Sequence, residues 1–458
     1  MEKFMEKYFK LQERDTTVRT EILAGLTTFM AMAYILMVNA GMFKELQVVS
    51  YNAIYIATAI SAVFGTLFIG LVANLPLAQA SGMGLNAFFV YTVCFEFGLT
   101  YANALTLVLL DGIIFIILTA TGLREKIFNS IPDCVKKVIP AGIGLFIAFI
   151  GLQNAGLSVD ASTLVTITSF TEDFHTKGIC ALLAVIGLLI TAIFHIKKVK
   201  GGILYGILIT WGLGIICELT GIYTPDAELG AYSLLPAGII STDFSALGKT
   251  FGQCFKIDFH AVGIFNFIVI VFSFLFVDLF DTLGTLIGVS TKANMLDENG
   301  KLPNIKPALL SDAIATSAGA ILGTSTTTTF VESSSGVAVG GRTGLTACTT
   351  GVLFLLATLF SPLFTSIPSF ATAPALIFVG FLMFETVTDL TFDGESLADT
   401  IPAYLCIIAM PLFYSISEGI CLGVISYVIL QACTGNAKKI NPLMYVLAVL
   451  FIMKYIFL

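Results

Sequence analysis

Long apolar runs recur along almost the whole chain, and they constrain its fold more than any other feature. Most are about 18–25 residues long, which is the length that a helix needs to cross a bilayer. The chain is 57% hydrophobic and only 12% charged, whereas a soluble domain is about 45–50% apolar and about 25% charged. One globular core cannot bury so much apolar surface. The sequence therefore predicts an all-α polytopic membrane protein embedded in the lipid bilayer.

The apolar runs fall into two sets of seven, separated by a polar, acidic stretch at 221–260. The first seven spans are expected at 20–43, 50–72, 78–95, 101–122, 133–155, 178–196 and 201–220. The second seven are expected at 261–290, 305–324, 329–341, 344–366, 371–390, 398–415 and 417–434. A last apolar stretch, 440–457, is either a terminal interfacial helix or an extra span.

The two sets resemble each other in order and in sequence. "TAISAVFGTLFIG" leads into "QASGMGLNA" in the first set, and "DAIATSAGAILGT" leads into "VESSSGVAV" in the second. Because seven is an odd number, the second copy starts on the opposite side of the membrane. This predicts 14 transmembrane segments in a 7+7 inverted repeat, a common construction among alternating-access transporters.

The lysines and arginines test this topology, because cytoplasmic loops of membrane proteins carry an excess of both. With the N-terminus inside, 18 of the 23 Lys and Arg residues fall in inside segments. They include those of the charged stretch 1–19 and the pair Lys438–Lys439. We therefore expect a multi-pass protein of the cell membrane with a cytoplasmic N-terminus.

Composition and residue spacing also argue against several classes of function. The formal net charge is −7 at pH 7, so no basic surface indicates binding to nucleic acid. The nine cysteines are scattered without a CxxC pair, and His175, His195 and His260 show no spacing typical of metal ligands. We expect neither a metal nor another cofactor.

Two of the runs are poor candidates for simple helices. The run 75–93 has a proline at its second position and groups Ser81 with two glycines, and the run 324–344 holds six threonines, four serines and four glycines. Such residues favour extended backbone or weaken a helix. We interpret spans 3 and 10 as broken, each with a short extended segment followed by a half-helix. A matched pair of this kind indicates a site near the bilayer midplane, although small residues also serve for close helix packing.

We single out three of the acidic residues inside the apolar runs, where a carboxylate is costly and marks a functional site by default. Glu332 lies in the second broken run; a structural ion pair, with Arg342 ten residues away, is the alternative. Asp278 and Asp281 share a helix face with Thr282. Two acids so close cannot both ionise cheaply, so at least one of them should tend to stay protonated. A proton carrier requires such a group. A hydrogen bond that orients the helix is the alternative for each.

Two further residues beside the broken runs are candidates for contact with a ligand. Asn86 offers both a donor and an acceptor, and its alternative role is a hydrogen bond between helices. Phe330 is placed to stack on a planar ligand next to Glu332, and packing is its alternative role.

Four segments in order resemble one known family. They are "RTEILAGLTTFMAMAYILMVN", "QASGMGLNAFF", "FVDLFDTLGTLIG" and "TTTTFVESSSGVAVGGRTGL". Together they are similar to the nucleobase:cation symporter-2 (nucleobase–ascorbate transporter) family, in its AzgA-like branch of adenine, guanine and hypoxanthine permeases. The resemblance covers nearly the whole chain.

This resemblance implies a secondary transporter, not an enzyme, that imports a purine nucleobase by proton symport and forms a homodimer. It also implies a core domain of spans 1–4 and 8–11 and a gate domain of spans 5–7 and 12–14. In this sequence the predicted parts are 1–19 (cytoplasmic), 20–122 and 261–366 (core), 133–220 and 371–434 (gate), 221–260 (extracellular loop) and 440–458 (C-terminal helix).

The resemblance also assigns residues to the site. Asp278 and Glu332 match the two acidic substrate-site positions of spans 8 and 10, and Asp278 with Asp281 would couple transport to protons. Asn86 and Asp281 match two polar positions of the family. Val331 and Ser333 match two positions at which backbone groups face the base. Uracil and xanthine carriers often have histidine where this chain has Thr282, which disfavours those substrates.

Other readings remain open from the residues alone. A carrier for xanthine or uracil is the nearest alternative. A sulfate-type anion transporter shares the predicted architecture, but Glu332 and Asp278 would repel an anion. An intramembrane protease is disfavoured because Asp278 lacks a second acid in a GxGD segment and Ser333 to Ser335 lack a plausible histidine partner. A channel is disfavoured by the inverted repeat with its broken pair.

Overall fold

The chain is represented by a computed structural model that describes residues 2–123, 132–162, 164–171, 173–225, 233–236, 238–256, 264–292, 295, 302, 304–389 and 397–457. The described residues are mostly helical. Ten of their helices are long and apolar enough to cross a membrane: Val18–Lys44, Tyr51–Ala73, Tyr101–Ala120, Cys134–Asn154, Phe174–Ile196, Gly202–Leu219, Ile305–Leu322, Gly344–Phe364, Ser369–Thr388 and Ile416–Cys433.

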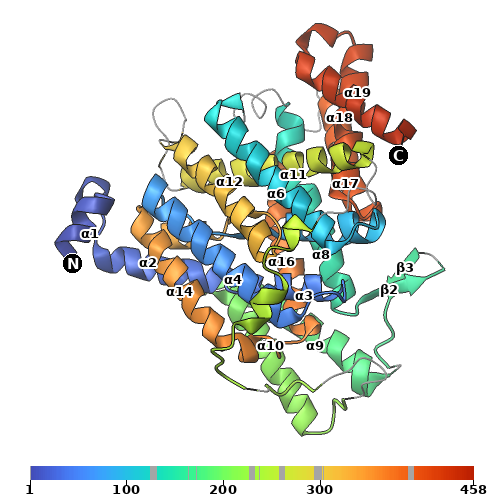
Figure 1. Cartoon of the computed structure of the whole chain (residues 1–458). Helices are drawn as coiled ribbons and strands as arrows, with labels where there is room; N and C mark the ends of the chain where they lie inside the picture. The colour runs from blue at the N-terminus through green and yellow to red at the C-terminus, as the bar shows by residue number, and fades with distance from the viewer. Residues whose placement is uncertain are drawn as a thin grey trace. The chain divides into compact units, whose positions relative to one another are not determined.

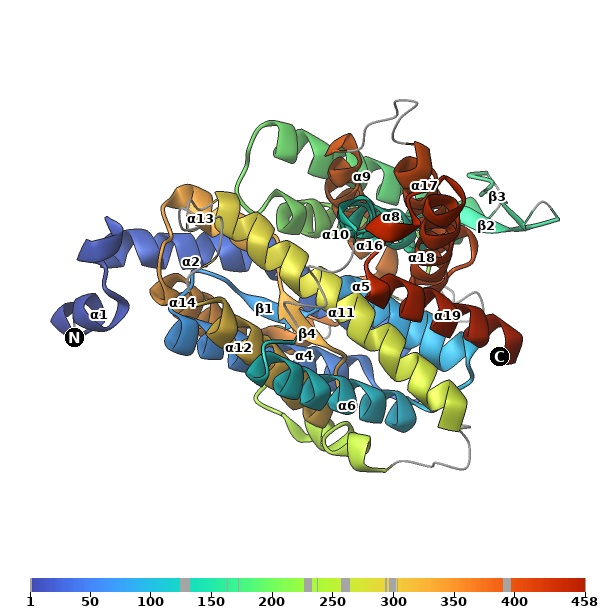
Figure 2. The same cartoon turned by 90° about the horizontal axis from the view of Figure 1, so that it is seen from above.

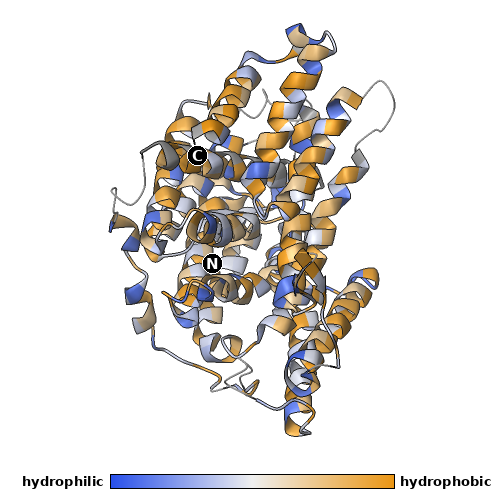
Figure 3. Ribbon diagram, turned by 90° about the vertical axis from the view of Figure 1, so that its right-hand side faces the viewer, coloured by the Kyte–Doolittle hydropathy of each residue, from blue (hydrophilic) through white to orange (hydrophobic). Residues whose placement is uncertain are grey.

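These ten helices match ten of the expected spans to within a few residues, which confirms a multi-pass helical membrane protein. Apolar residues dominate the helices, as Figure 3 shows in orange. Shorter apolar helices coincide with further expected runs: Met83–Glu96, Ile270–Leu279, Leu397–Leu412 and Pro442–Met453. The total of fourteen spans stays a prediction.

The helices are grouped in two compact units, each built from three stretches of chain. The first unit holds Met1–Ala80, Ile147–Thr250 and Glu332–Val379, and the second holds Ser81–Phe146, Phe251–Val331 and Gly380–Leu458. Two helices, α8 (Asp133–Asn154) and α16 (Ser369–Phe384), contribute residues to both units.

In the first unit, α14 packs against α2 and α4, and α13 packs against α2 (Figure 1). Its helices are α1 (Glu2–Phe9), η1 (Gln12–Arg14), α2 (Val18–Met32), α3 (Tyr34–Lys44), α4 (Tyr51–Phe68), η2 (Ile69–Ala73), η4 (Phe174–Gly178), α9 (Ile179–Ile196), α10 (Gly202–Leu219), η5 (Ser245–Lys249), α13 (Ser333–Val339), α14 (Gly344–Ala357), η7 (Thr358–Phe360) and α15 (Ser361–Phe364).

Small residues allow these helices to touch through their backbones. A Cβ atom added to Gly344 would lie 1.8 Å from the carbonyl oxygen of Gly70, at the junction of η2 with α14. A Cβ atom added to Gly25 on α2 would lie 2.6 Å from the carbonyl oxygen of Thr346. Membrane helices associate through such close packing, since lipid supplies no hydrophobic drive between them.

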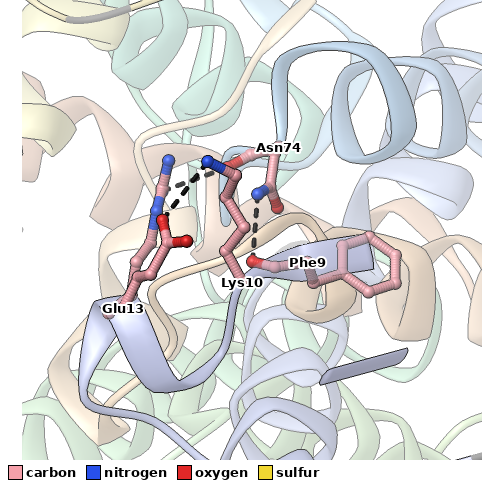
Figure 4. Close-up of polar contacts among 5 residues, drawn as sticks. Phe9, Lys10, Glu13 and Asn74 are labelled. Carbon is pink, nitrogen blue, oxygen red and sulfur yellow. Dashed lines mark hydrogen bonds and ion pairs between the residues drawn. The ribbon is translucent and has the colours of Figure 1, made fainter. Parts of the chain in front are cut away.

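The N-terminal segment is fastened to the same unit (Figure 4). The side-chain amide of Asn74 donates to the carbonyl oxygen of Phe9 at 3.0 Å, and Lys10 pairs with Glu13 at 3.2 Å on the surface. Arg14 donates to the carbonyl oxygens of Asn74 and Arg342, at 3.1 and 2.8 Å. The segment before the first span is therefore an ordered part of this unit.

In the second unit, α12 lies beside α6, and α17 packs against α18 (Figure 2). Its helices are α5 (Met83–Ala87), η3 (Phe88–Glu96), α6 (Tyr101–Ala120), η6 (Gln253–Phe255), α11 (Ile264–Lys292), α12 (Ile305–Leu322), η8 (Glu385–Asp389), α17 (Leu397–Leu412), α18 (Ile416–Cys433), η9 (Ala437–Lys439) and α19 (Pro442–Phe457). The last of them, which covers the ambiguous stretch 440–457, packs along α18.

Four short strands interrupt the helices. The strand β1 (Gln79–Ser81) precedes α5, and β4 (Thr327–Thr329) precedes α13, so each irregular run contains a strand. That spans 3 and 10 are broken stays a prediction. The end of β1 and β4 form a two-stranded sheet, and the N–H of Gly82 donates to the carbonyl oxygen of Thr326 at 3.0 Å. In the first unit, β2 (Ser158–Ala161) and β3 (Leu164–Ile167) form an exposed antiparallel hairpin.

Candidate functional site

Glu332 lies in the first unit, three residues after β4 and immediately before α13. Its carboxylate oxygen Oε1 accepts a hydrogen bond from the hydroxyl of Tyr34 at 2.5 Å. Tyr34 is fully buried at the start of α3, whereas Glu332 is only half-buried. A charge-assisted bond of this kind is among the stronger hydrogen bonds in proteins, so the carboxylate is held in one orientation.

The residues around Glu332 argue against its alternative role in a structural ion pair. The guanidinium of Arg342 donates instead to the carbonyl oxygens of Val337 and Gly341, at 2.7 and 2.8 Å, where α13 ends. Ser333, next to Glu332, is buried and accepts a hydrogen bond from the N–H of Ala78 at 3.0 Å. The side chain of Ser333 therefore fixes the start of α13.

Asp278 lies in the second unit on α11 and is fully buried. The hydroxyl of Thr282, one turn later, contacts an oxygen of Asp278 at 2.9 Å and an oxygen of Asp312 on α12 at 3.0 Å. The expected shared face of Asp278 and Thr282 is thus confirmed, and it brings in a second acid. Asp281 also belongs to α11, but its side chain lies outside the described residues.

The Thr282 hydroxyl has a chemical consequence for the two acids that it joins. A threonine hydroxyl carries one hydrogen, so it can donate to only one carboxyl oxygen at a time. The other contact is attractive only if that carboxyl group supplies a hydrogen of its own. Two ionised carboxylates at such short range would also repel each other. The arrangement therefore suits one proton held by Asp278 and Asp312 together.

Asn86 is fully buried in the second unit, where its side chain joins the two extended segments. Its oxygen accepts hydrogen bonds from the hydroxyls of Ser81, at 2.6 Å, and Ser325, and its nitrogen donates to the carbonyl oxygen of Ser81 at 3.3 Å. Both partners lie on extended segments and not on helices, so the role of Asn86 at a ligand site stays a prediction. Of the other candidates in the second unit, Phe330 is buried, while Val331 is 49% exposed.

Sequence reasoning missed four buried polar residues. Asp312 and Asp111 lie inside the apolar helices α12 and α6, and the rule that singled out Asp278 applies equally to them. Glu21 on α2 accepts hydrogen bonds from the N–H groups of Arg342, Thr343 and Thr346, so it caps the start of α14. Tyr34 had no signal, because a tyrosine is ordinary within an apolar run.

The chain resembles known proteins in sequence and in structure. The sequence profile of the Permease family matches residues 19–420. Guanine/hypoxanthine permease PbuG of Bacillus subtilis is 43% identical over 99% of this chain and 100% of its own length. Putative permease MJ0326 of Methanocaldococcus jannaschii is 42% identical over 100% and 99%, and adenine permease AdeQ of Escherichia coli is 38% identical over 99% and 96%.

Two solved structures resemble this chain in fold. The transmembrane domain of a cyanobacterial bicarbonate transporter, BicA, superposes with a TM-score of 0.62 at 15% sequence identity, over 88% of this chain and 97% of that one. Murine Slc26a9, an anion transporter, gives a TM-score of 0.59 at 11% identity, over 91% and 68%. The family resemblance carried by the four sequence segments is confirmed by the profile and by the relatives. The chain is a member of the Permease family, a family of transporters and not of enzymes.

Proposed function

We propose that this permease imports purine nucleobases (adenine, guanine and/or hypoxanthine) by proton symport across the cell membrane. The observation that carries the proposal is Glu332, a half-buried carboxylate in an apolar unit that is oriented by Tyr34. The names of the relatives support the same substrate class, since PbuG is a guanine/hypoxanthine permease and AdeQ an adenine permease.

A purine is planar and neutral, with hydrogen-bond donors along its edges. A carboxylate accepts two parallel hydrogen bonds, from a ring N–H together with an exocyclic amine or a second ring N–H. A site that depends on such bonds rejects analogues without the donors, because its own polar groups would be left unpaired. We assign this role to Glu332. The backbone groups of Val331 and Ser333 and the ring of Phe330 are proposed as further contacts to the base, and Asn86 as a residue that supports the site.

Proton coupling is assigned to Asp278. Its neutral form is favoured whenever the surroundings exclude water, and Thr282 and Asp312 offer a place to share the proton. Protonation removes a negative charge and lowers the cost of moving the helix through low dielectric. Asp281 is proposed to hold Asp278 in place or to share the proton.

The remaining features of the proposal concern architecture. We propose fourteen spans in a 7+7 inverted repeat, a core and a gate domain with the boundaries predicted from the sequence, a cytoplasmic N-terminus and a homodimer. The strands β1 and β4 support the idea that spans 3 and 10 are broken, because backbone without helical bonds survives at membrane depth only where protein or a cavity surrounds it.

The test is uptake of radiolabelled adenine, guanine, hypoxanthine, xanthine, uracil and sulfate by cells that express the chain, with and without a protonophore. We expect uptake of one or more of the three named purines, abolished by the protonophore. Transport of xanthine or uracil alone, or of sulfate, would replace the proposed substrate. Accumulation that follows sodium instead of the pH gradient would show that the coupling ion is wrong.

A further inference from the structure

We infer that Tyr34 is a positioning residue for substrate recognition: its hydroxyl fixes the Glu332 carboxylate so that the base meets two aligned acceptor oxygens. This inference rests on the proposed function and goes beyond it, because it names a residue on another helix that sets selectivity. It is carried by the 2.5 Å bond between the Tyr34 hydroxyl and Oε1 of Glu332.

The two residues come from distant parts of the chain but from the same unit. Tyr34 begins α3 directly after Ala33, where the helical hydrogen bonding of the first membrane span is interrupted. The interruption places the tyrosine near the middle of that 27-residue span, Val18–Lys44. Glu332 belongs to a distant part of the chain and lies immediately before α13. The fully buried hydroxyl of Tyr34 needs a protein partner at such depth, and Glu332 supplies it.

Each partner is fixed by its own surroundings. Tyr34 is fully buried on α3, which packs along α4. The chain next to Glu332 is held by the bond from the Ala78 N–H to the Ser333 hydroxyl oxygen. Because a buried tyrosine has only two side-chain torsions to restrain, its hydroxyl is a rigid donor. The carboxylate of Glu332 is therefore directed by Tyr34.

Counting acceptors shows why this matters for a ligand. A carboxylate has two oxygens with about four acceptor positions. Tyr34 occupies one position on Oε1, and the carboxylate keeps further acceptor positions for donors from a base. A fixed carboxylate plane rewards a base that offers two adjacent donors, such as the ring N–H and exocyclic amine of guanine. A freely rotating carboxylate would discriminate less.

The decisive variant is Tyr34→Phe, with Tyr55→Phe as its matched control. Tyr55 lies in the same unit, is equally buried, and donates its hydroxyl hydrogen to the backbone carbonyl of Ala357 at 2.9 Å instead of to a carboxylate. Both changes remove one buried hydroxyl, so both will cost some stability. Only Tyr34→Phe should alter how the purified full-length protein recognises purines.

The measurement is binding of guanine and of its 1-, 7- and 9-methyl derivatives, each of which lacks one ring donor. For Tyr34→Phe we expect guanine to bind about 10-fold more weakly. The preference for guanine over the derivative that the wild type rejects most should fall by about the same factor. Tyr55→Phe should keep both values within about twofold of the wild type.

A double-mutant cycle separates direct positioning from a general structural effect. In the Glu332→Ala background, which leaves Tyr34 no side-chain oxygen to position, Tyr34→Phe should change guanine binding by less than about twofold, and the shifts in melting temperature of the two single variants should not add. The inference would be overturned if the melting-temperature shifts add and if Tyr34→Phe keeps the guanine selectivity that Tyr55→Phe keeps. The proposed purine transport would not be affected by that outcome. If the wild type binds no purine, the proposed function fails and the inference falls with it.

Discussion

The surroundings of Glu332 and of Asp278 differ in a way that separates two tasks. Glu332 accepts a hydrogen bond from a phenol, that of Tyr34, and is half-buried. Asp278 is fully buried and shares a single hydroxyl with a second acid, Asp312. A donor stabilises an ionised carboxylate, whereas a neighbouring acid destabilises it. The first arrangement suits a charged acceptor for a ligand, and the second suits a group that takes up and releases a proton.

The strongest test of this comparison is Asp278→Asn, for which we expect complete loss of purine accumulation against a gradient. The amide mimics the protonated acid in shape, so purine exchange should continue. Proteoliposomes with an imposed pH gradient measure accumulation, and counterflow without a gradient measures exchange. Asp243→Asn is the control, since Asp243 lies in an exposed loop. An Asp278→Asn carrier that still concentrates purine would end the assignment of proton coupling to this residue.

Glu332→Gln should produce the next largest effect, a loss of roughly 10–100-fold in purine affinity. A hydrogen bond to a charged group contributes about 1.5–3 kcal/mol, which corresponds to that factor. The variant should remain folded and inserted, because glutamine still accepts from Tyr34. Calorimetry or equilibrium binding on purified protein provides the affinity. Unchanged binding would show that Glu332 does not contact the base.

Asp312→Asn sharpens the comparison, because it removes the second acid but keeps Asp278. If the two share one proton, accumulation on a pH gradient should fall by about 10-fold, while counterflow changes little. The parallel variant is Asp111→Asn, which removes another fully buried acid of the same unit from α6. Equal losses for both would indicate a general cost of neutralising buried acids and not a shared proton.

Asn86→Ala should have the smallest effect on recognition and a clear effect on stability. The hydroxyls of Ser81 and Ser325 would lose the acceptor that they share. Each buried polar group without a partner costs about 1–3 kcal/mol. Thermal unfolding with and without purine separates the two effects. A loss of purine affinity as large as that of Glu332→Gln would instead place Asn86 in direct contact with the base.

The sequence predicted the membrane helices well because the bilayer imposes a fixed length on each of them. The expected runs 101–122 and 201–220, for example, correspond to the helices Tyr101–Ala120 and Gly202–Leu219. It also predicted strands in both irregular runs, since threonine, serine and glycine weaken a helix locally. The 7+7 repeat, the orientation and the roles of the site residues stay predictions.

What the sequence could not predict was pairing between distant residues. Tyr34 and Glu332 are separated by 298 positions, and Thr282 and Asp312 by 30. Hydrophobic periodicity describes one helix at a time and contains no information on its partners. The charge of Asp312 within an apolar run could have singled it out in the sequence. Tyr34 has no charge and could not be singled out in that way. The contacts that orient the acids therefore emerge only from the folded unit.

The contact between Gly70 and Gly344 has a mechanical consequence. A Cβ atom at residue 344 would lie 1.8 Å from the Gly70 carbonyl oxygen, so no side chain fits between η2 and α14. The two backbones are in direct contact, and sliding one along the other would force peptide atoms into collision. This junction is therefore rigid and is not a hinge. Any flexing of the first unit during transport must be sought elsewhere in it.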